Sequence, residues 1–167
     1  CEELIKNGYE ISFNITGLKE LPSECFDENG NIKPYIRNYG FLNKNDKASY
    51  TQLVDIMKKQ DLYLFPSKAE CSSIALCEAN GFGLPCFVYD TGGTGNYVVN
   101  GENGYMLPLH CGGAAFARKI IECIKNTELD KLSAGAVRRY KELLNWNVWS
   151  EKVHKELDKL LNANDVG

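Results

Sequence analysis

The chain has 167 residues, of which 44% are hydrophobic, and it carries 19 basic and 22 acidic side chains. This size favours one domain with a single core, and the balanced charge offers no electrostatic footprint for a nucleic-acid backbone or an anionic membrane. No apolar run approaches the roughly 20 residues of a membrane-spanning helix, and the first residues lack a secretory signal, so we expect a cytoplasmic protein without nucleic-acid partners or membrane insertion.

The first part of the chain reads as two strands followed by a helix and a third strand. Residues 9–17 have a strand-like composition and end on a glycine, and residues 36–42 form a second candidate strand. The periodicity then changes at residues 50–59, which lead directly into an apolar strand at 62–65. The apolar side chains on one face of that predicted helix are Leu53, Ile56 and Met57.

The rest of the chain continues the alternation. A helix that carries Leu76 stops at Gly81 and Gly83, ahead of a proline, and a strand at 86–89 follows it. After a glycine-rich stretch, TGGTGNYVVNGENG, the sequence predicts a short strand at 105–107. The C-terminal helices occupy about 113–161: one at 113–126, a long stretch through Val137, Tyr140, Leu143 and Leu144, and a last one at 149–161.

Apolar strands that alternate with helices of about ten residues indicate a parallel sheet covered on both sides. The predicted fold is therefore an α/β domain with a doubly wound parallel sheet. The chain opens on Cys1 within what reads as the last turns of a helix, without a strand before it. We accordingly expect residues 1–167 to be one domain that lacks its first strand and is a fragment of a larger protein.

Polar and glycine residues follow the predicted strands at 62–65 and 86–89. Ligands of open parallel sheets bind outside the carboxyl ends of the strands, where such loops converge. A helix that begins near Ser72 would point unpaired N–H groups and the positive end of its dipole outward, which suits a phosphate. The residues of the two loops are Glu70, Cys71, Ser72 and Ser73 after the first strand, and Thr91, Gly92 and Gly93 after the second.

Two glutamates stand eight positions apart in this stretch, at Glu70 and Glu78. Eight helical residues rise about 12 Å and leave the second side chain roughly 80° around from the first, so both carboxylates could face one broad side. Carboxylates accept hydrogen bonds from vicinal hydroxyls such as those of ribose, so a nucleotide sugar fits the layout. The alternative is structural: acidic residues and serines also stabilise helix starts, and glycines make turns, without any ligand.

The block from 65 to 108 resembles the donor-binding half of the glycosyltransferase family 4 enzymes. Six elements of the family pattern occur in order and at the same spacing: Pro66-Ser67, Glu70, Glu78-Ala79, Gly83-Leu84-Pro85, Gly92-Gly93 and Gly101-Glu102-Asn103-Gly104. A looser likeness runs from Tyr9 to Trp149. Two departures stand out: Cys71-Ser72-Ser73 replaces a common Gly-Phe-Gly, and Asn96 replaces a glutamate after the Gly-Gly turn.

The resemblance implies the carboxyl-terminal Rossmann-like half of a GT-B glycosyltransferase that transfers a hexose from a nucleoside diphosphate sugar with retention. Glu70 would be the catalytic residue that holds donor-sugar hydroxyls, and Glu78 would hold the ribose. The remaining donor-binding residues would be Cys71, Ser72, Ser73, Thr91, Gly92 and Gly93. No metal or other cofactor is implied, since helix amides and basic side chains would neutralise the diphosphate.

The resemblance further implies that basic residues which grip the diphosphate lie upstream of Cys1. It also implies a missing N-terminal domain that binds the acceptor, a glycan or lipid-linked saccharide, in surface polysaccharide or glycan synthesis. The fragment alone would then be inactive, and the full-length enzyme could lie peripherally at the inner membrane. Two alternatives stay open: a non-catalytic nucleotide-sugar module that acts with a separate acceptor-binding subunit, and an interaction domain with no nucleotide site.

The seven cysteines do not have the spacing of a metal site or a disulfide framework. Cys77, Cys86 and Cys123 stand among apolar neighbours and are predicted to be small buried thiols. Trp146 and Trp149 are predicted to be core anchors. Four other polar residues read as surface side chains: Lys19, Lys68, His110 and His154.

Overall fold

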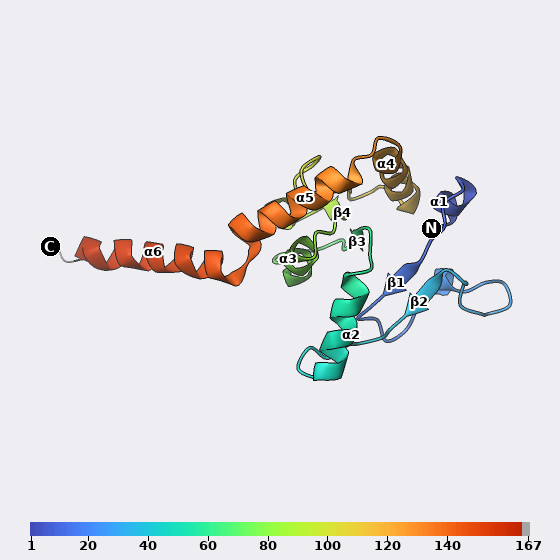
Figure 1. Ribbon diagram of the computed structural model, residues 1–167, viewed down its shortest axis with the longest axis horizontal. Coiled ribbons are helices and arrows are strands. Elements are labelled where there is room, and N and C mark those ends of the chain that lie inside the picture. Colours follow the sequence, from blue (N-terminus) through green and yellow to red (C-terminus); the bar gives the residue numbers. More distant parts are fainter. Residues whose placement is uncertain (165–167) are drawn as a thin grey trace. The chain divides into compact units, whose positions relative to one another are not determined.

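The computed structural model describes residues 1–164, which are drawn as a ribbon in Figure 1. The chain falls into two compact units. The first unit consists of Cys1–Gln60 together with Gly113–Ile121, and the second consists of Asp61–Gly112 together with the chain from Glu122 onward. The helix α4 (Gly113–Lys125) therefore contributes to both units.

The first unit is built on two short parallel strands, β1 (Phe13–Ile15) and β2 (Ile36–Asn38), in which Phe13 lies opposite Ile36. Both predicted strands are present, but each is only three residues long. The other elements of the unit are α1 (Glu2–Lys6), a 3-10 turn η1 (Ser23–Cys25) and α2 (Lys47–Met57). The Asp46 carboxylate caps α2 by accepting from the Ser49 backbone N–H at 2.8 Å. The helix therefore begins at Lys47, before the start at residue 50 that the sequence predicts.

The second unit contains a three-stranded parallel sheet in the order β3 (Tyr63–Phe65), β4 (Cys86–Asp90) and β5 (Gly104–Pro108). Cys86, Phe87 and Val88 are completely buried in the central strand, as expected for a strand that is covered on both faces. A Cβ at Gly104 would lie 1.9 Å from the Cys86 carbonyl oxygen, so only glycine lets β5 approach β4 so closely.

Two helices of the second unit pack closely on each other: α3 (Ile74–Gly81) and α5 (Leu129–Arg139), which continues as a π-helical turn, η3 (Tyr140–Leu144). Gly81 of α3 lies close to η3, since a Cβ there would be 3.1 Å from the Tyr140 ring, a tight contact that the ring could relieve by a small shift. Helix α5 and η3 confirm the predicted long helical stretch, and α4 confirms the one at 113–126.

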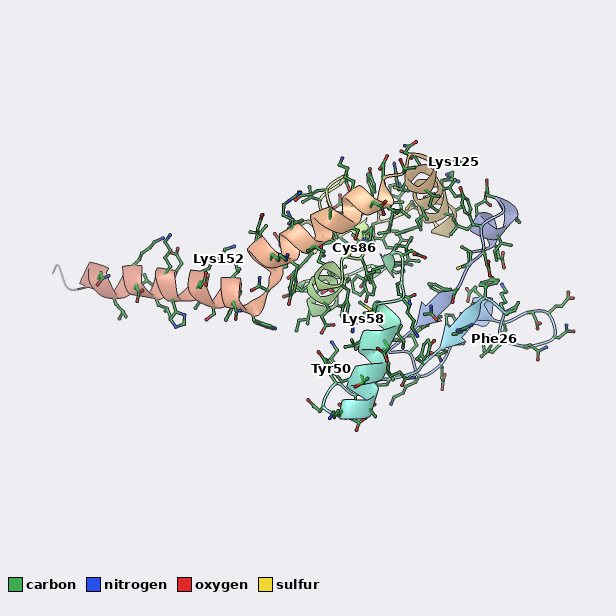
Figure 2. The ribbon with its side chains drawn as sticks, viewed as in Figure 1. Phe26, Tyr50, Lys58, Cys86, Lys125 and Lys152 are labelled. Atoms are coloured by element: carbon green, nitrogen blue, oxygen red, sulfur yellow. The ribbon has the colours of Figure 1, made fainter. Side chains whose placement is uncertain are left out.

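The last helix, α6 (Trp146–Asn164), extends away from the rest of the second unit and contacts it mainly through η3 (Figure 1). The prediction that Trp146 and Trp149 anchor the core is wrong, since these side chains are 68% and 57% exposed. Their rings instead pack edge to face on each other, with centroids 5.8 Å apart. Figure 2 shows the same helix with the side chains around Lys152 projecting from it.

All seven cysteines are free thiols. Cys86 and Cys123 are fully buried, which confirms their predicted place in the core, whereas Cys77 is only half-buried. Burial raises the pKa of the Cys86 thiol to about 12, and Figure 2 shows Cys86 within the crowded centre of the second unit. Among the helices within residues 1–164, none combines the length and apolar character needed to cross a bilayer.

Candidate functional site

The loops that follow β3 and β4 meet at the carboxyl ends of these two strands. The Gly93 backbone N–H donates to the Glu70 carbonyl at 2.9 Å. A Cβ at Gly92 would lie 2.0 Å from the Glu70 carbonyl oxygen, and one at Gly93 would lie 2.2 Å from that of Cys71. The structure therefore brings Glu70, Cys71, Gly92 and Gly93 together, and it does so through a backbone approach that side chains at the two glycines would prevent.

Thr91 joins the same loop contact through its side chain. Its hydroxyl donates to the Lys68 carbonyl at 3.1 Å, and its backbone N–H donates to the Thr94 hydroxyl at 3.2 Å. Thr94 is 1% exposed and donates in turn to the carbonyl of Tyr89 at 3.0 Å. Thr94 was not singled out from the sequence, yet its buried hydroxyl fixes the turn that carries the two glycines.

The mouth of α3 lies directly after Cys71. The helix begins at Ile74, and the Ser73 hydroxyl caps it by accepting from the Leu76 N–H at 3.3 Å. Ser73 is buried, whereas Ser72 is exposed. Of the two predicted serines, Ser72 alone keeps its hydroxyl at the surface of this helix mouth. Because the helix starts at Ile74, Glu70 lies outside it, and the helical spacing expected between the glutamates does not apply.

The Glu70 side chain turns back onto its own loop. Its Oε1 atom accepts from the backbone N–H groups of Cys71 and Ser72, each at 3.1 Å. The carboxylate is half-buried and both hydrogen bonds end on the same oxygen. This arrangement fixes the direction of the carboxylate beside the mouth of α3 without using its second oxygen, Oε2, as an acceptor in these two bonds.

Glu78 lies on α3 and is half-buried, in the neighbourhood of Tyr63 and Cys77. Burial raises the pKa of Tyr63 to about 12, and the charges of Cys86 and Glu78 contribute to this rise. Burial also raises the pKa of the Cys77 thiol, again with a contribution from Glu78. The acidic side chain thus makes its surroundings unfavourable for a second negative charge.

A buried pair of amides, which sequence reasoning missed, joins α3 to the hairpin before β5. The Asn103 amide nitrogen donates to the side-chain oxygen of Asn80 at 2.7 Å and to the Tyr97 carbonyl at 2.7 Å. Both asparagines are completely buried. Asn103 stands in the Gly-x-x-Gly hairpin of the sequence pattern, and this position was the only feature of the sequence that could have pointed to its role. The Tyr97 hydroxyl lies 3.2 Å from that of Ser72, so the same segment reaches the mouth of α3.

Two arginines of α5 hold the turn after β4. The Arg139 guanidinium donates to the Asn96 carbonyl at 3.0 Å, and Arg138 forms a 3.0 Å ion pair with Glu102. The backbone of Asn96, which stands where the family pattern has a glutamate, is thus bound within the domain. These contacts keep the loops that follow β4 in place.

The structure therefore brings together two interlocked loops, a helix mouth with an exposed serine hydroxyl, and the half-buried carboxylate of Glu70. Glu78 lies further along α3, in the neighbourhood of Tyr63 and Cys77. Backbone amides, hydroxyls and carboxylates of this kind can bind oxygen-rich ligands that combine phosphate with vicinal hydroxyls. Within residues 1–164, no group of three or more His, Cys, Asp or Glu side chains is placed to hold a metal ion.

The chain resembles several curated proteins in sequence. It is 27% identical over 133 residues to the "UDP-N-acetylglucosamine--peptide N-acetylglucosaminyltransferase GtfA subunit" of Streptococcus pneumoniae, a match that covers 72% of this chain and 26% of the relative. The GtfA subunit of Streptococcus gordonii is 30% identical over 136 residues, covering 74% of this chain and 27% of that protein. A sucrose synthase of Melioribacter roseus is 26% identical, covering 91% and 19%. The chain thus spans about a quarter or less of these relatives.

Solved structures share the fold. The pneumococcal O-GlcNAc transferase GtfA, solved in complex with UDP and GlcNAc, has a TM-score of 0.70 at 24% identity, with 96% of this chain and 31% of that chain covered. A sucrose-phosphate synthase from Thermosynechococcus elongatus has a TM-score of 0.66 at 20% identity, covering 81% and 33%. The Rossmann-like α/β architecture of GT-B glycosyltransferases expected from the sequence is therefore confirmed.

A protein-family model also matches most of the chain. The family model described as "Glycosyl transferases group 1" matches residues 3–138, which cover parts of both units and all of the predicted site residues. The parallel strands, the two loops and the helix mouth all fall within this range. The chain therefore belongs to the group 1 glycosyl transferases.

Proposed function

We propose that the chain is the donor-binding domain of a glycosyltransferase that transfers a hexose from a nucleoside diphosphate sugar with retention, as in glycosyltransferase family 4. The observation that carries this proposal is the interlocking of the loops after β3 and β4 beside the mouth of α3, in a chain of the group 1 family. Relatives of the fold that were solved with UDP or UDP-glucose support a nucleotide sugar as the ligand.

The diphosphate would rest at the mouth of α3, where the first helical N–H groups and the Ser72 hydroxyl are donors. Cys71 and Ser73 would contribute backbone, and Thr91, Gly92 and Gly93 would form the opposite wall. These donors would neutralise the charge that grows on the leaving diphosphate without a metal ion. The close approach at both glycines supports this role because it holds the loop after β4 directly against the loop that leads into α3.

Glu70 would be the catalytic residue that holds hydroxyls of the donor sugar. Its Oε1 is anchored to the backbone N–H groups of Cys71 and Ser72, and this leaves Oε2 to accept from the sugar. Glu78 would accept from the vicinal hydroxyls of the ribose. A carboxylate held by its own loop is already oriented when the ligand arrives, which lowers the ordering cost of binding.

A second function is supported by the names of two relatives. One curated relative is called a GtfA subunit, and one solved structure of the same fold is a GtfA/B complex. The chain could accordingly belong to a nucleotide-sugar module that acts with a separate acceptor-binding subunit. In the first proposal the acceptor, a glycan or lipid-linked saccharide, is bound by a further domain of the same polypeptide. A second Rossmann-like domain in the full-length protein would favour the single-chain enzyme.

The test is nucleotide binding by the full-length protein, measured by titration calorimetry with UDP, GDP, ADP and UDP-glucose. Glu78→Ala should weaken binding of the bare nucleotide about ten- to a hundredfold, because it removes charge-assisted hydrogen bonds worth about 1.5–3 kcal/mol. Glu70→Ala should spare the bare nucleotide and weaken the sugar-bearing donor. Glu151→Ala, which alters an exposed side chain on α6, is the matched control. Equal losses for both ligands in both site variants would refute the assigned roles.

A further inference from the structure

One loop contacts both ends of α3. At the start of the helix, the Tyr97 hydroxyl lies 3.2 Å from the Ser72 hydroxyl. Near its end, the Asn80 side-chain oxygen accepts from the Asn103 amide at 2.7 Å. The segment 97–103 therefore contacts the chain just before α3 and the last turn of the helix, although the paired residues are 25 and 23 positions apart in sequence.

The buried end of this segment is fully hydrogen-bonded. One Asn103 proton goes to Asn80 and the other to the Tyr97 carbonyl, while its oxygen accepts from the Val99 N–H at 2.8 Å. Since Asn80 and Asn103 are completely buried, loss of any of these bonds would leave a polar group without a partner and without water. The backbone at Tyr97 is consequently fixed by the core, and its phenol is presented to Ser72 from a rigid base.

We propose that Tyr97 is a positioning residue of the donor site, which acts by fixing the direction of the Ser72 hydroxyl. This inference rests on the proposed function, in which Ser72 donates to the diphosphate. An exposed serine populates several rotamers, and selecting one of them costs free energy when a ligand binds. A phenol that already selects the rotamer removes part of this cost, so the helix mouth is organised before the nucleotide arrives.

The experiment measures UDP binding to the full-length protein, with GDP and ADP in parallel, and the melting temperature without ligand. Tyr97→Phe removes only the hydroxyl. We expect the dissociation constant of the bound nucleotide to rise about threefold to tenfold, the value of one net hydrogen bond. The melting temperature should hardly change, because the Ser72 hydroxyl is exposed and can bond to water instead.

The matched control is Tyr105→Phe. The Tyr105 hydroxyl donates to the Glu128 carboxylate at 2.8 Å, on a strand of the same unit but outside the site. Its removal breaks a charge-assisted hydrogen bond, so it should lower the melting temperature and leave nucleotide binding unchanged. The two tyrosine variants thus separate an effect on the site from an effect on the fold.

A double variant tests whether Tyr97 acts through Ser72. In a Ser72→Ala background, Tyr97→Phe should cause no further loss of affinity. The inference is overturned if Tyr97→Phe binds the nucleotide as tightly as the wild type, or if it still weakens binding when Ser72 is absent, since the phenol would then contact the ligand directly. A wild-type protein that binds none of the three nucleotides would instead overturn the proposed function, and this inference with it.

Discussion

The Asn103 amide donates to the side-chain oxygen of Asn80 at 2.7 Å, and both asparagines are completely buried. The two residues are not equivalent. Asn103 also donates to the Tyr97 carbonyl and accepts from the Val99 N–H, whereas Asn80 donates to the Leu76 carbonyl of its own helix at 2.8 Å. Asn103 is therefore the member of the pair on which three other polar groups depend.

The first prediction compares alanine at these two positions. Asn103→Ala leaves three groups without their partner, namely the buried Asn80 oxygen and the half-buried Tyr97 carbonyl and Val99 N–H. Each unpaired group that is shielded from water costs about 1–3 kcal/mol. Asn80→Ala removes the same atoms but orphans mainly one proton of Asn103. We expect the free energy of unfolding to fall by at least about 2 kcal/mol more in Asn103→Ala, measured by urea denaturation. Equal losses would mean that cavity volume, not hydrogen bonding, sets the cost.

Much of the fold could be predicted from local sequence. The run Cys86–Tyr89 is apolar on both faces, and the preceding helix ends where Gly81, Gly83 and Pro85 stand in the sequence. The strands at Phe13–Ile15 and Ile36–Asn38 were predicted too long, because strand composition does not show how many residues find a partner. Trp146 and Trp149 were wrongly predicted to lie in the core, because the sequence does not distinguish a buried tryptophan from one on an exposed helix.

The meeting of the two site loops could also be predicted, because both follow the carboxyl ends of neighbouring parallel strands. Sequence could not show that the Glu70 carboxylate bonds to its own loop, since this depends on a side-chain rotamer. It could not show the contacts of Tyr97 with Ser72 or of Asn103 with Asn80 either. Those partners are 25 and 23 residues apart, and no local pattern reports a pairing over that distance.

The second prediction concerns the close approach of the two loops. Gly93 has φ of −87°, which any residue can adopt. Alanine at this position therefore causes no backbone strain and tests only the steric effect of an added Cβ. Its Cβ would lie 2.2 Å from the Cys71 carbonyl oxygen, so the loops must separate by more than about 1 Å to reach an ordinary contact distance. Gly93→Ala should therefore lower both the melting temperature and nucleotide affinity, measured by thermal unfolding with and without UDP.

Gly113→Ala is the matched control for this substitution. A Cβ at Gly113 meets nothing within 4 Å, and the residue begins α4, where alanine is the better helix former. This variant should be neutral or slightly more stable, by up to about 1 kcal/mol. A Gly93→Ala protein that behaves like Gly113→Ala would show that the loops can separate freely and would remove the steric basis of the site.

The third prediction is a loss of stability at alkaline pH. Burial raises the pKa of Tyr63 from 10.0 to about 12, and it raises that of the neighbouring Cys86 from 9.0 to about 12. Between these values the unfolded chain releases protons that the folded protein retains, so the free energy of unfolding falls as pH rises. The contribution is fully present below pH 9 and is lost on approaching pH 12.

Urea denaturation at a series of pH values from neutral to pH 12 measures this loss. Tyr63→Phe keeps the ring, which stacks on Phe65, and removes the titrating hydroxyl, so its stability should decline less steeply above pH 10. Tyr50→Phe is the control because that side chain is 52% exposed. Parallel curves for the wild type and Tyr63→Phe would contradict the assignment of the alkaline loss to this tyrosine.

The fourth prediction follows from the two exposed tryptophans of α6, which are the only tryptophans in the chain. With exposures of 68% and 57%, Trp146 and Trp149 should emit at wavelengths typical of indole in water and should be readily quenched by acrylamide. Unfolding in urea should then shift the emission maximum little, while circular dichroism shows the full transition. Because each ring shields part of the other, Trp146→Ala should increase quenching of the remaining indole. A blue-shifted emission that moves to the red on unfolding, in this chain by itself, would contradict the exposed placement and indicate that α6 packs its tryptophans against apolar surface.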